Sequence, residues 1–156
     1  MSHLVLLCGP AGAGKSTHAR RYAAQGYAVA SVDELAWAAG QPAAHPLPDD
    51  VARQLAEVLR SRVAALLDEG RDVVVDASFW SRAARGEYRT LGAAHGADTV
   101  VVYVETPRDV ALARVAARSG DGAHQVRLTP ETAAAYYDGF EVPTPDEGPL
   151  EVVRGG

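Results

Sequence analysis

Short runs of apolar residues recur along the chain and alternate with stretches in which apolar residues return at helical spacing. Five runs fit β-strands, namely residues 4–8, 28–32, 72–75, 99–104 and, more weakly, 151–153. In the stronger runs the apolar residues are consecutive, which is typical of strands covered on both faces. Because such strands alternate with helices, we expect an α/β fold with a parallel sheet of five strands flanked by helices.

Capping residues predict where several helices begin. Asp49 precedes a long stretch of apolar residues at helical spacing, and this helix is expected to stop near Gly70. Residues 106–109 combine a capping-box pattern with a proline at the first helical position. Thr129, followed by a proline, marks the start of a further helix.

The composition fits one domain, residues 1–156, with loops expected at the proline-rich segments 41–48 and 142–149. Hydrophobic residues make up 47% and charged residues 22%, which excludes wholesale disorder, and no apolar run is long enough to span a membrane. The N-terminus lacks the pattern of a secretory signal, and the single Cys8 cannot form an internal disulfide, so a cytoplasmic protein is expected. The net charge of −5 argues against a broad basic face for long nucleic acids.

A glycine-rich segment between the first predicted strand and the following helix has the pattern G-x-x-x-x-G-K-[ST]. Small residues there let the backbone curl so that its N–H groups point at phosphate oxygens, and the N-terminus of the helix adds a positive dipole end. Lys15, the only lysine of the chain, is expected to bridge the β- and γ-phosphates, and Ser16 to ligate Mg²⁺. The predicted nucleotide-binding residues of this segment are Gly9, Ala11, Gly12, Ala13, Gly14, Lys15, Ser16 and Thr17.

The absence of asparagine and the length of the chain narrow the class of phosphate-loop protein. The sequence contains no asparagine, which excludes GTPases that read guanine with N-K-x-D and protein kinases with the loop H-R-D-x-x-x-x-N. Large ring-forming ATPases normally need a further helical domain and more than 156 residues. A compact kinase that uses ATP and Mg²⁺ is therefore expected.

Two aspartates follow predicted strands and are the candidates for catalytic carboxylates. Asp33 follows the run 28–32 and is assigned as the base that accepts the proton of an attacking hydroxyl, although it could instead cap a helix. Asp76 follows three valines and is assigned to magnesium, with a substrate contact or the capping of a turn as alternatives. Parallel sheets place ligands at the carboxyl ends of their strands, so both side chains should face one cleft. Which of the two is the base stays open at this point.

A basic pair in the second half of the chain is expected to close over the phosphates. Arg114 and Arg118 lie four residues apart on one helix face, and glycines follow within residues 119–122. We expect a small helical lid at approximately residues 114–130, with Arg114 and Arg118 contacting the nucleotide and Arg118 assisting catalysis. The alternative is an ordinary solvated arginine face.

Aromatic and cationic residues near the two aspartates are candidates for acceptor recognition. They could equally be packed in the core or lie on a solvated helix face. The candidates are Trp37, Ser78, Phe79, Trp80, Arg82 and Arg85, together with Asp33 itself.

The sequence resembles the small P-loop kinases of the polynucleotide-kinase, zeta-toxin and chloramphenicol-phosphotransferase group. This resemblance implies that Asp33 activates the acceptor hydroxyl and that Arg118 is the lid cation on the phosphates. Polynucleotide kinases of the group commonly carry an arginine three residues after the catalytic aspartate, where this chain has Ala36, so a nucleic-acid acceptor is less favoured. The segments that carry the resemblance are 9–17, 31–33, 74–78, Arg114 with Arg118, and 140–143 with Glu147.

Three functional hypotheses follow from these observations. The leading one is a phosphotransferase that moves the γ-phosphoryl group of ATP to a hydroxyl of a small molecule, such as an antibiotic, nucleoside or sugar. The second takes the 5′-hydroxyl of a nucleic acid as the acceptor. The third is a nucleotide-binding regulatory protein without an acceptor. The sequence indicates no membrane partner and leaves the oligomeric state open.

Overall fold

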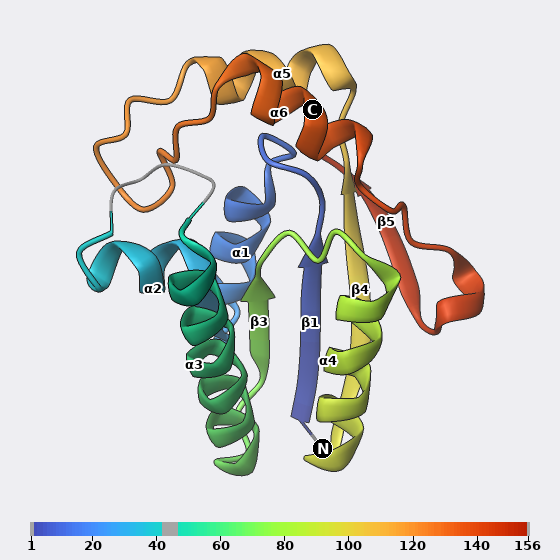
Figure 1. The fold of residues 1–156 in the computed structure, drawn as a ribbon. Coiled ribbons are helices and arrows are strands. Elements are labelled where there is room, and N and C mark those ends of the chain that lie inside the picture. The colour runs from blue at the N-terminus through green and yellow to red at the C-terminus, as the bar shows by residue number, and fades with distance from the viewer. Residues whose placement is uncertain (1, 42–46, 156) are drawn as a thin grey trace.

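The computed structural model describes residues 2–41 and 47–155. Five strands form one parallel sheet in the order β2-β3-β1-β4-β5 (Figure 1). The predicted α/β class with a five-stranded parallel sheet is confirmed. The strands are β1 (Ser2–Cys8), β2 (Ala28–Ser31), β3 (Val73–Asp76), β4 (Ala97–Glu105) and β5 (Leu150–Arg154).

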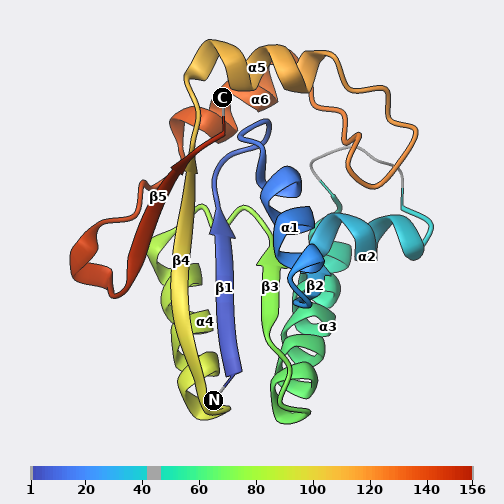
Figure 2. The ribbon, with the colours of Figure 1, turned by 180° about the vertical axis from the view of Figure 1, so that it is seen from behind.

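Helices cover both faces of the sheet and its carboxyl edge. Helices α3 and α4 lie on one face (Figure 1), α1 lies on the other (Figure 2), and α5 and α6 lie above the carboxyl ends of the strands. A short 3₁₀ helix precedes β5 inside the predicted loop 142–149. The helices are α1 (Lys15–Ala24), α2 (Val32–Ala38), α3 (Asp49–Asp68), α4 (Arg82–Ala94), α5 (Arg108–Ala116), α6 (Pro130–Asp138) and η1 (Pro145–Glu147).

The sheet separates two apolar clusters, because successive side chains of a strand point to opposite faces. In β1, Leu4 and Leu6 belong to the cluster under α3 and α4, whereas Val5 and Leu7 belong to the cluster under α1. All four of these side chains are at most 2% exposed. Burial on both faces explains why the residues of β1 form a continuous apolar run. The phosphate-binding segment therefore follows a strand that is packed on both sides.

Several element ends differ from the predicted ones. Asp49 is the first residue of α3 and Pro48 takes the cap position. Thr106 does not cap α5, because its hydroxyl donates to the carbonyl of Ala13 at 2.7 Å. Thr129 does cap α6 and accepts a hydrogen bond from the N–H of Thr132.

Part of the predicted loop 41–48 lies outside the described residues. Between α5 and α6 the chain runs without regular helix or strand from residue 117 to residue 129, which covers most of the predicted lid. None of the helices in the described ranges is long and apolar enough to cross a membrane.

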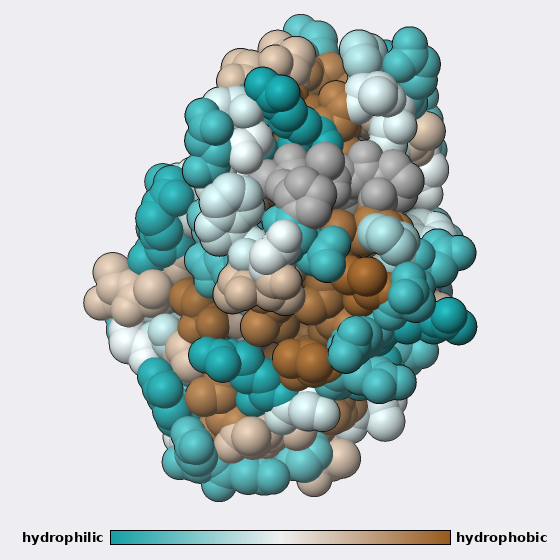
Figure 3. Space-filling view, turned by 60° about the vertical axis from the view of Figure 1, so that its left-hand side comes forward, coloured by the Kyte–Doolittle hydropathy of each residue, from teal (hydrophilic) through white to brown (hydrophobic). Residues whose placement is uncertain are grey.

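Some apolar side chains remain on the surface of the face that carries α2 and α3. Figure 3 shows apolar residues gathered on this side of the molecule, surrounded by hydrophilic ones. Among large apolar side chains, Trp37 of α2 is 43% exposed and Val58 of α3 is 45% exposed. Trp37 is therefore accessible from solvent, as an acceptor contact must be.

Candidate active site

The candidate site lies at the carboxyl ends of the three strands β1, β2 and β3. Asp76 ends β3 and is paired in register with Leu7 of β1 and Ser31 of β2. The phosphate loop, residues 9–16, follows β1, and Asp33 follows β2. The lid segment, residues 114–130, lies above this edge (Figure 1). The strand topology thus brings together residues that are far apart in the sequence.

The phosphate loop needs glycine at two positions for conformational reasons. Gly12 and Gly14 have φ angles of 83° and 100°, in the left-handed region that other residues rarely adopt. A Cβ atom on Gly12 would also collide with the backbone carbonyl of Ala111 in α5. Inside the loop, the N–H of Ala13 donates to the carbonyl of Pro10 at 3.1 Å. These glycines allow the tight curl that the motif predicts.

Side chains from the neighbouring segments hold the carbonyls of the phosphate loop. Thr106, buried at the end of β4, donates to the carbonyl of Ala13, and Arg114 of α5 donates to that of Gly12 at 3.2 Å. Arg114 thus contacts the loop through its backbone, while its contact with a nucleotide stays a prediction. Thr106 was not among the predicted site residues. The contact spans 93 positions, and no local pattern indicates it.

Lys15 lies within the phosphate loop and faces both candidate carboxylates. Its Nζ donates to the carbonyls of Gly9 at 2.7 Å and Pro10 at 3.2 Å. Burial lowers the pKa of Lys15, and the negative charges of Asp76 and Asp33 partly offset this effect. The ammonium group is therefore positioned by the loop itself, next to the strand ends where a phosphate would bind.

Ser16 and Asp76 form a pair of oxygen ligands that fits magnesium. The hydroxyl of Ser16 donates to Oδ2 of Asp76 at 3.4 Å, and Asp76 is only 6% exposed. Burial raises the pKa of Asp76, and the ammonium of Lys15 counters that rise. Within the described ranges no three His, Cys, Asp or Glu side chains cluster as a metal site. Mg²⁺ is commonly held by one or two carboxylates together with waters and substrate phosphates, so Asp76 and Ser16 are residues that could hold it.

Asp33 lies in the first turn of α2 and is not its cap. The cap is Ser31, whose hydroxyl accepts a hydrogen bond from the N–H of Glu34 at 3.2 Å, so the capping alternative for Asp33 is wrong. Arg118 of the lid segment lies near Asp33 and Asp76. Burial lowers the pKa of Arg118, and these two carboxylates counter the shift. Arg118 therefore lies close enough to both carboxylates to interact with their charges, and its contact with a nucleotide stays a prediction.

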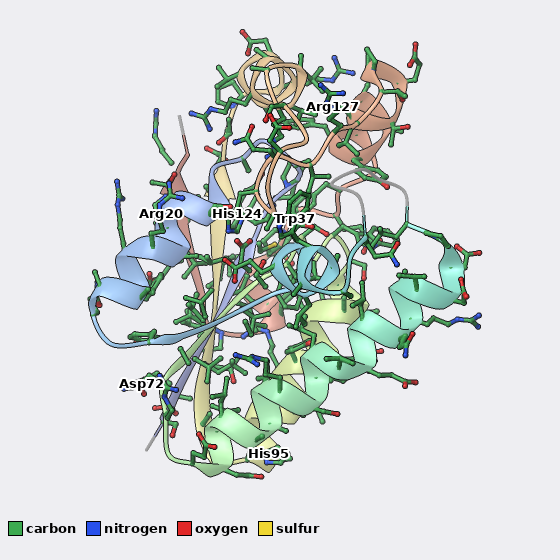
Figure 4. The ribbon with its side chains drawn as sticks, turned by 90° about the vertical axis from the view of Figure 1, so that its left-hand side faces the viewer. Arg20, Trp37, Asp72, His95, His124 and Arg127 are labelled. Carbon is green, nitrogen blue, oxygen red and sulfur yellow. The ribbon has the colours of Figure 1, made fainter. Side chains whose placement is uncertain are left out.

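A histidine of the lid segment contacts both the phosphate loop and α2. Nδ1 of His124 lies 3.2 Å from Oγ of Ser16, and Nε2 lies 2.9 Å from Oε1 of Glu34 (Figure 4). Neither His124 nor Glu34 was predicted as a site residue. The two contacts span 108 and 90 positions, so sequence spacing gave no signal for them.

Three further predicted acceptor contacts, and Thr17 from the predicted nucleotide-binding residues, lie at the surface. Ser78 and Trp80 are exposed on the segment that follows β3, and Trp80 is 56% exposed. Arg82, at the start of α4, is exposed and pairs with Asp146 at 2.9 Å. Thr17 is exposed on α1, where its hydroxyl accepts from Arg20 at 3.4 Å. These positions are accessible, and their contacts with substrate stay predictions.

Phe79 and Arg85 are buried, which corrects their predicted contact with the acceptor. Arg85 is 1% exposed and donates to both carboxylate oxygens of Glu147, at 2.8 and 3.0 Å. Its Nη1 also donates to the carbonyl of Phe79 at 2.8 Å. The ring of Phe79 is 4% exposed and packs edge-on against Tyr88. Phe79 belongs to the apolar cluster beneath α4, and Arg85 is a buried residue of α4 itself, so an acceptor cannot reach either side chain.

Replacing Glu147 by alanine is expected to destabilise the fold by about 3–5 kcal/mol, because a buried guanidinium would lose its counter-ion. Hydrogen bonds from Arg85 lower the pKa of Glu147. The stabilisation is therefore fully present above the unfolded value of about 4.3 and is lost as the pH falls through the lowered pKa. Urea unfolding at neutral pH measures the loss. A matched change of the exposed Asp146 to alanine is the control, and a loss for Glu147→Ala below about 1 kcal/mol would contradict the ion-pair argument.

The chain matches one known protein family over most of its length. A family model described as "AAA domain" matches residues 4–143, and the chain belongs to this family. No curated protein matches the sequence. The match and the geometry above define the chain as a P-loop protein with a kinase-like fold.

Solved structures of kinases share this fold. A sugar kinase from Janibacter sp. HTCC2649 is 21% identical with a TM-score of 0.70, and the match covers 99% of this chain and 86% of that one. A gluconokinase from Sinorhizobium meliloti 1021 is 22% identical with a TM-score of 0.66, covering 97% and 82%. A chain of the Pnkp1/Rnl/Hen1 RNA repair complex is 17% identical with a TM-score of 0.75, covering 89% of this chain but 44% of that one. At these identities the likeness concerns the fold.

Proposed function

We propose that the protein transfers the γ-phosphoryl group of ATP, with Mg²⁺, to a hydroxyl of a small molecule such as a sugar, nucleoside or antibiotic. The observation that carries this proposal is the convergence of Lys15, Asp76 with Ser16, and Arg118 around Asp33 at one sheet edge. Phosphoryl transfer requires mainly positioning and charge stabilisation, and these groups supply both.

Each residue has a defined part in the proposed reaction. The phosphate loop and Lys15 bind the β- and γ-phosphates, and Arg118 stabilises the negative charge on the transferred group. Magnesium held by Ser16 and Asp76 would neutralise phosphate charge. Asp33 accepts the proton of the attacking hydroxyl, whose oxygen forms the new bond to the γ-phosphorus as the bond to the β–γ bridging oxygen breaks. The products are ADP and the phosphorylated acceptor.

A small neutral acceptor fits the surroundings of Asp33 better than a polyanion. Glu34 follows Asp33 directly, Ala36 stands where an arginine would hold a nucleic-acid phosphate, and the chain carries a net charge of −5. Trp37 exposes an aromatic ring that can stack on a sugar or a planar ring. The likeness to a sugar kinase and a gluconokinase supports a small acceptor over a nucleic acid.

A nucleic-acid 5′-hydroxyl is the second candidate acceptor. The likeness to a chain of an RNA repair complex favours it. Binding of a polyanion through phosphate contacts weakens steeply as the salt concentration rises, whereas binding of a neutral sugar does not. Salt dependence therefore separates the two candidates.

The test offers γ-labelled ATP and Mg²⁺ with separate panels of sugars, nucleosides, hydroxylated antibiotics and 5′-hydroxyl oligonucleotides, each at two salt concentrations. We expect label in a small-molecule product, at a rate that changes little with salt. Label in an oligonucleotide, lost at high salt, would replace the proposal with the second candidate. Nucleotide binding without any labelled acceptor, together with partner binding that depends on nucleotide, would favour a regulatory protein.

A further inference from the structure

The lid segment contacts the candidate site through His124, which lies between two elements of the site. On one side is Ser16 in the first turn of α1, and on the other is Glu34 in the first turn of α2. Both imidazole nitrogens are thus engaged, at 3.2 and 2.9 Å. The imidazole is 34% exposed, so most of its surface is covered. One side chain therefore links the lid, the phosphate loop and the helix that carries Asp33.

The contact with Glu34 is well defined in its direction. A carboxylate oxygen only accepts hydrogen bonds, so Nε2 carries the proton and donates to Oε1 of Glu34. Nδ1 faces the hydroxyl of Ser16, which also contacts Asp76 at 3.4 Å. When Oγ of Ser16 coordinates magnesium, it has one lone pair fewer for a hydrogen bond with Nδ1 of His124. The contact between His124 and Glu34 uses neither Ser16 nor Asp76, so it takes up no atom that is assigned to magnesium.

Glu34 is held through its backbone N–H and through its carboxylate, and it is the direct neighbour of Asp33 in the chain. Its backbone N–H donates to the hydroxyl of Ser31 at 3.2 Å, and its carboxylate accepts from His124. Asp33 lies between Ser31 and Glu34 in the same helical turn. The position of the lid and the placement of the Asp33 carboxylate are therefore mechanically connected through Glu34.

We propose that His124 and Glu34 form a positioning pair that couples closure of the lid segment to the placement of Asp33 against the acceptor. The effect on catalysis rests on the proposed function. The link between the lid segment and α2 does not, because it depends only on the contact between His124 and Glu34. His124 is a positioning residue, because it acts on the acceptor through Glu34 and the turn that carries Asp33.

The first experiment needs no substrate. Hydrogen exchange of the backbone amides is measured in wild type, His124→Ala, His124→Gln and Glu34→Ala. We expect His124→Ala and Glu34→Ala to raise exchange both in residues 117–129 and in α2, because each removes the same contact. His124→Gln should restore near-wild-type exchange, because its side-chain amide can donate from about the position of Nε2. His95→Ala is the matched control, since His95 pairs with Asp68 at the opposite end of the sheet (Figure 4).

The second experiment uses the acceptor that the label-transfer assay identifies. His124→Ala and Glu34→Ala should each lower kcat by about tenfold to a hundredfold, the scale of a small misplacement of reacting groups, while the Kd of Mg·nucleotide changes by less than about threefold. The double variant should be no worse than either single one, because residues that act as a unit are not additive.

The two experiments separate failure of the pair from failure of the proposed function. Additive losses in the double variant, no rescue by His124→Gln, or unchanged exchange of α2 in His124→Ala would each overturn the positioning pair. Coupled exchange in a protein that labels no acceptor would keep the link between lid and α2 but would overturn its catalytic role.

Discussion

Lys15→Ala is expected to abolish detectable turnover and to weaken binding of Mg·ATP about tenfold to a hundredfold. The ammonium group is the one lysine charge of the chain, and the phosphate loop itself holds it at 2.7 Å from the carbonyl of Gly9. A hydrogen bond from a charged donor contributes about 1.5–3 kcal/mol, which corresponds to that loss of affinity. Titration calorimetry measures the affinity, and transfer of label from γ-labelled ATP measures turnover.

A matched control separates this effect from damage to the fold. Arg20→Ala removes a cation from the exposed face of the same helix, where Arg20 contacts Thr17, and should leave nucleotide affinity within about threefold. Far-ultraviolet circular dichroism should be the same for both variants. Unchanged nucleotide affinity in a folded Lys15→Ala protein would remove the phosphate loop from the account.

Asp33→Asn should keep nucleotide binding and cut transfer by about 10²–10⁴-fold. Asparagine keeps the shape of the side chain but cannot accept the proton of the acceptor hydroxyl, and positioned acid–base catalysis contributes on this scale. The first turn of α2 should be preserved, because Ser31 and not Asp33 caps it. The measurement is the rate of transfer at saturating ATP and acceptor, with the Kd of nucleotide determined in parallel.

Asp76→Asn provides the comparison that decides which carboxylate is the base. Its oxygen faces Ser16, so this variant should weaken the dependence of nucleotide binding on Mg²⁺, which Asp33→Asn should leave intact. Full turnover in Asp33→Asn would contradict its assignment as the base, and intact Mg²⁺ dependence in Asp76→Asn would contradict its assignment to magnesium.

The sequence predicted those parts of the site that local rules determine. The phosphate loop is a short segment in which Gly12 and Gly14 adopt positive φ, so its residue pattern alone indicates its conformation. Asp33 and Asp76 were found because the carboxyl ends of parallel strands meet at one edge, whatever lies between them in the sequence. The order of helices and strands followed from hydrophobic periodicity in the same way.

Residues that depend on long-range packing were missed or misplaced. Arg85 lies near the start of a predicted helix, where the local sequence indicates a solvated arginine. It is buried instead, because Glu147, 62 positions further along the chain, neutralises its charge. The residues around Thr106 have the pattern of a helix cap, but its hydroxyl donates a hydrogen bond to a carbonyl of the phosphate loop instead. His124 lies between two helices, so no helical spacing relates it to the residues that it contacts. Only the folded lid segment reveals its contacts with Ser16 and Glu34.

The most direct test of the central claim follows the γ-phosphoryl group itself. Wild type and Lys15→Ala are incubated with γ-labelled ATP, Mg²⁺ and a fractionated extract of small metabolites, and the label is traced by chromatography. We expect a labelled organic phosphate with the wild type alone, and none with Asp33→Asn on the same time scale. Label found only in ATP and inorganic phosphate, to the same extent with wild type and Lys15→Ala, would contradict it.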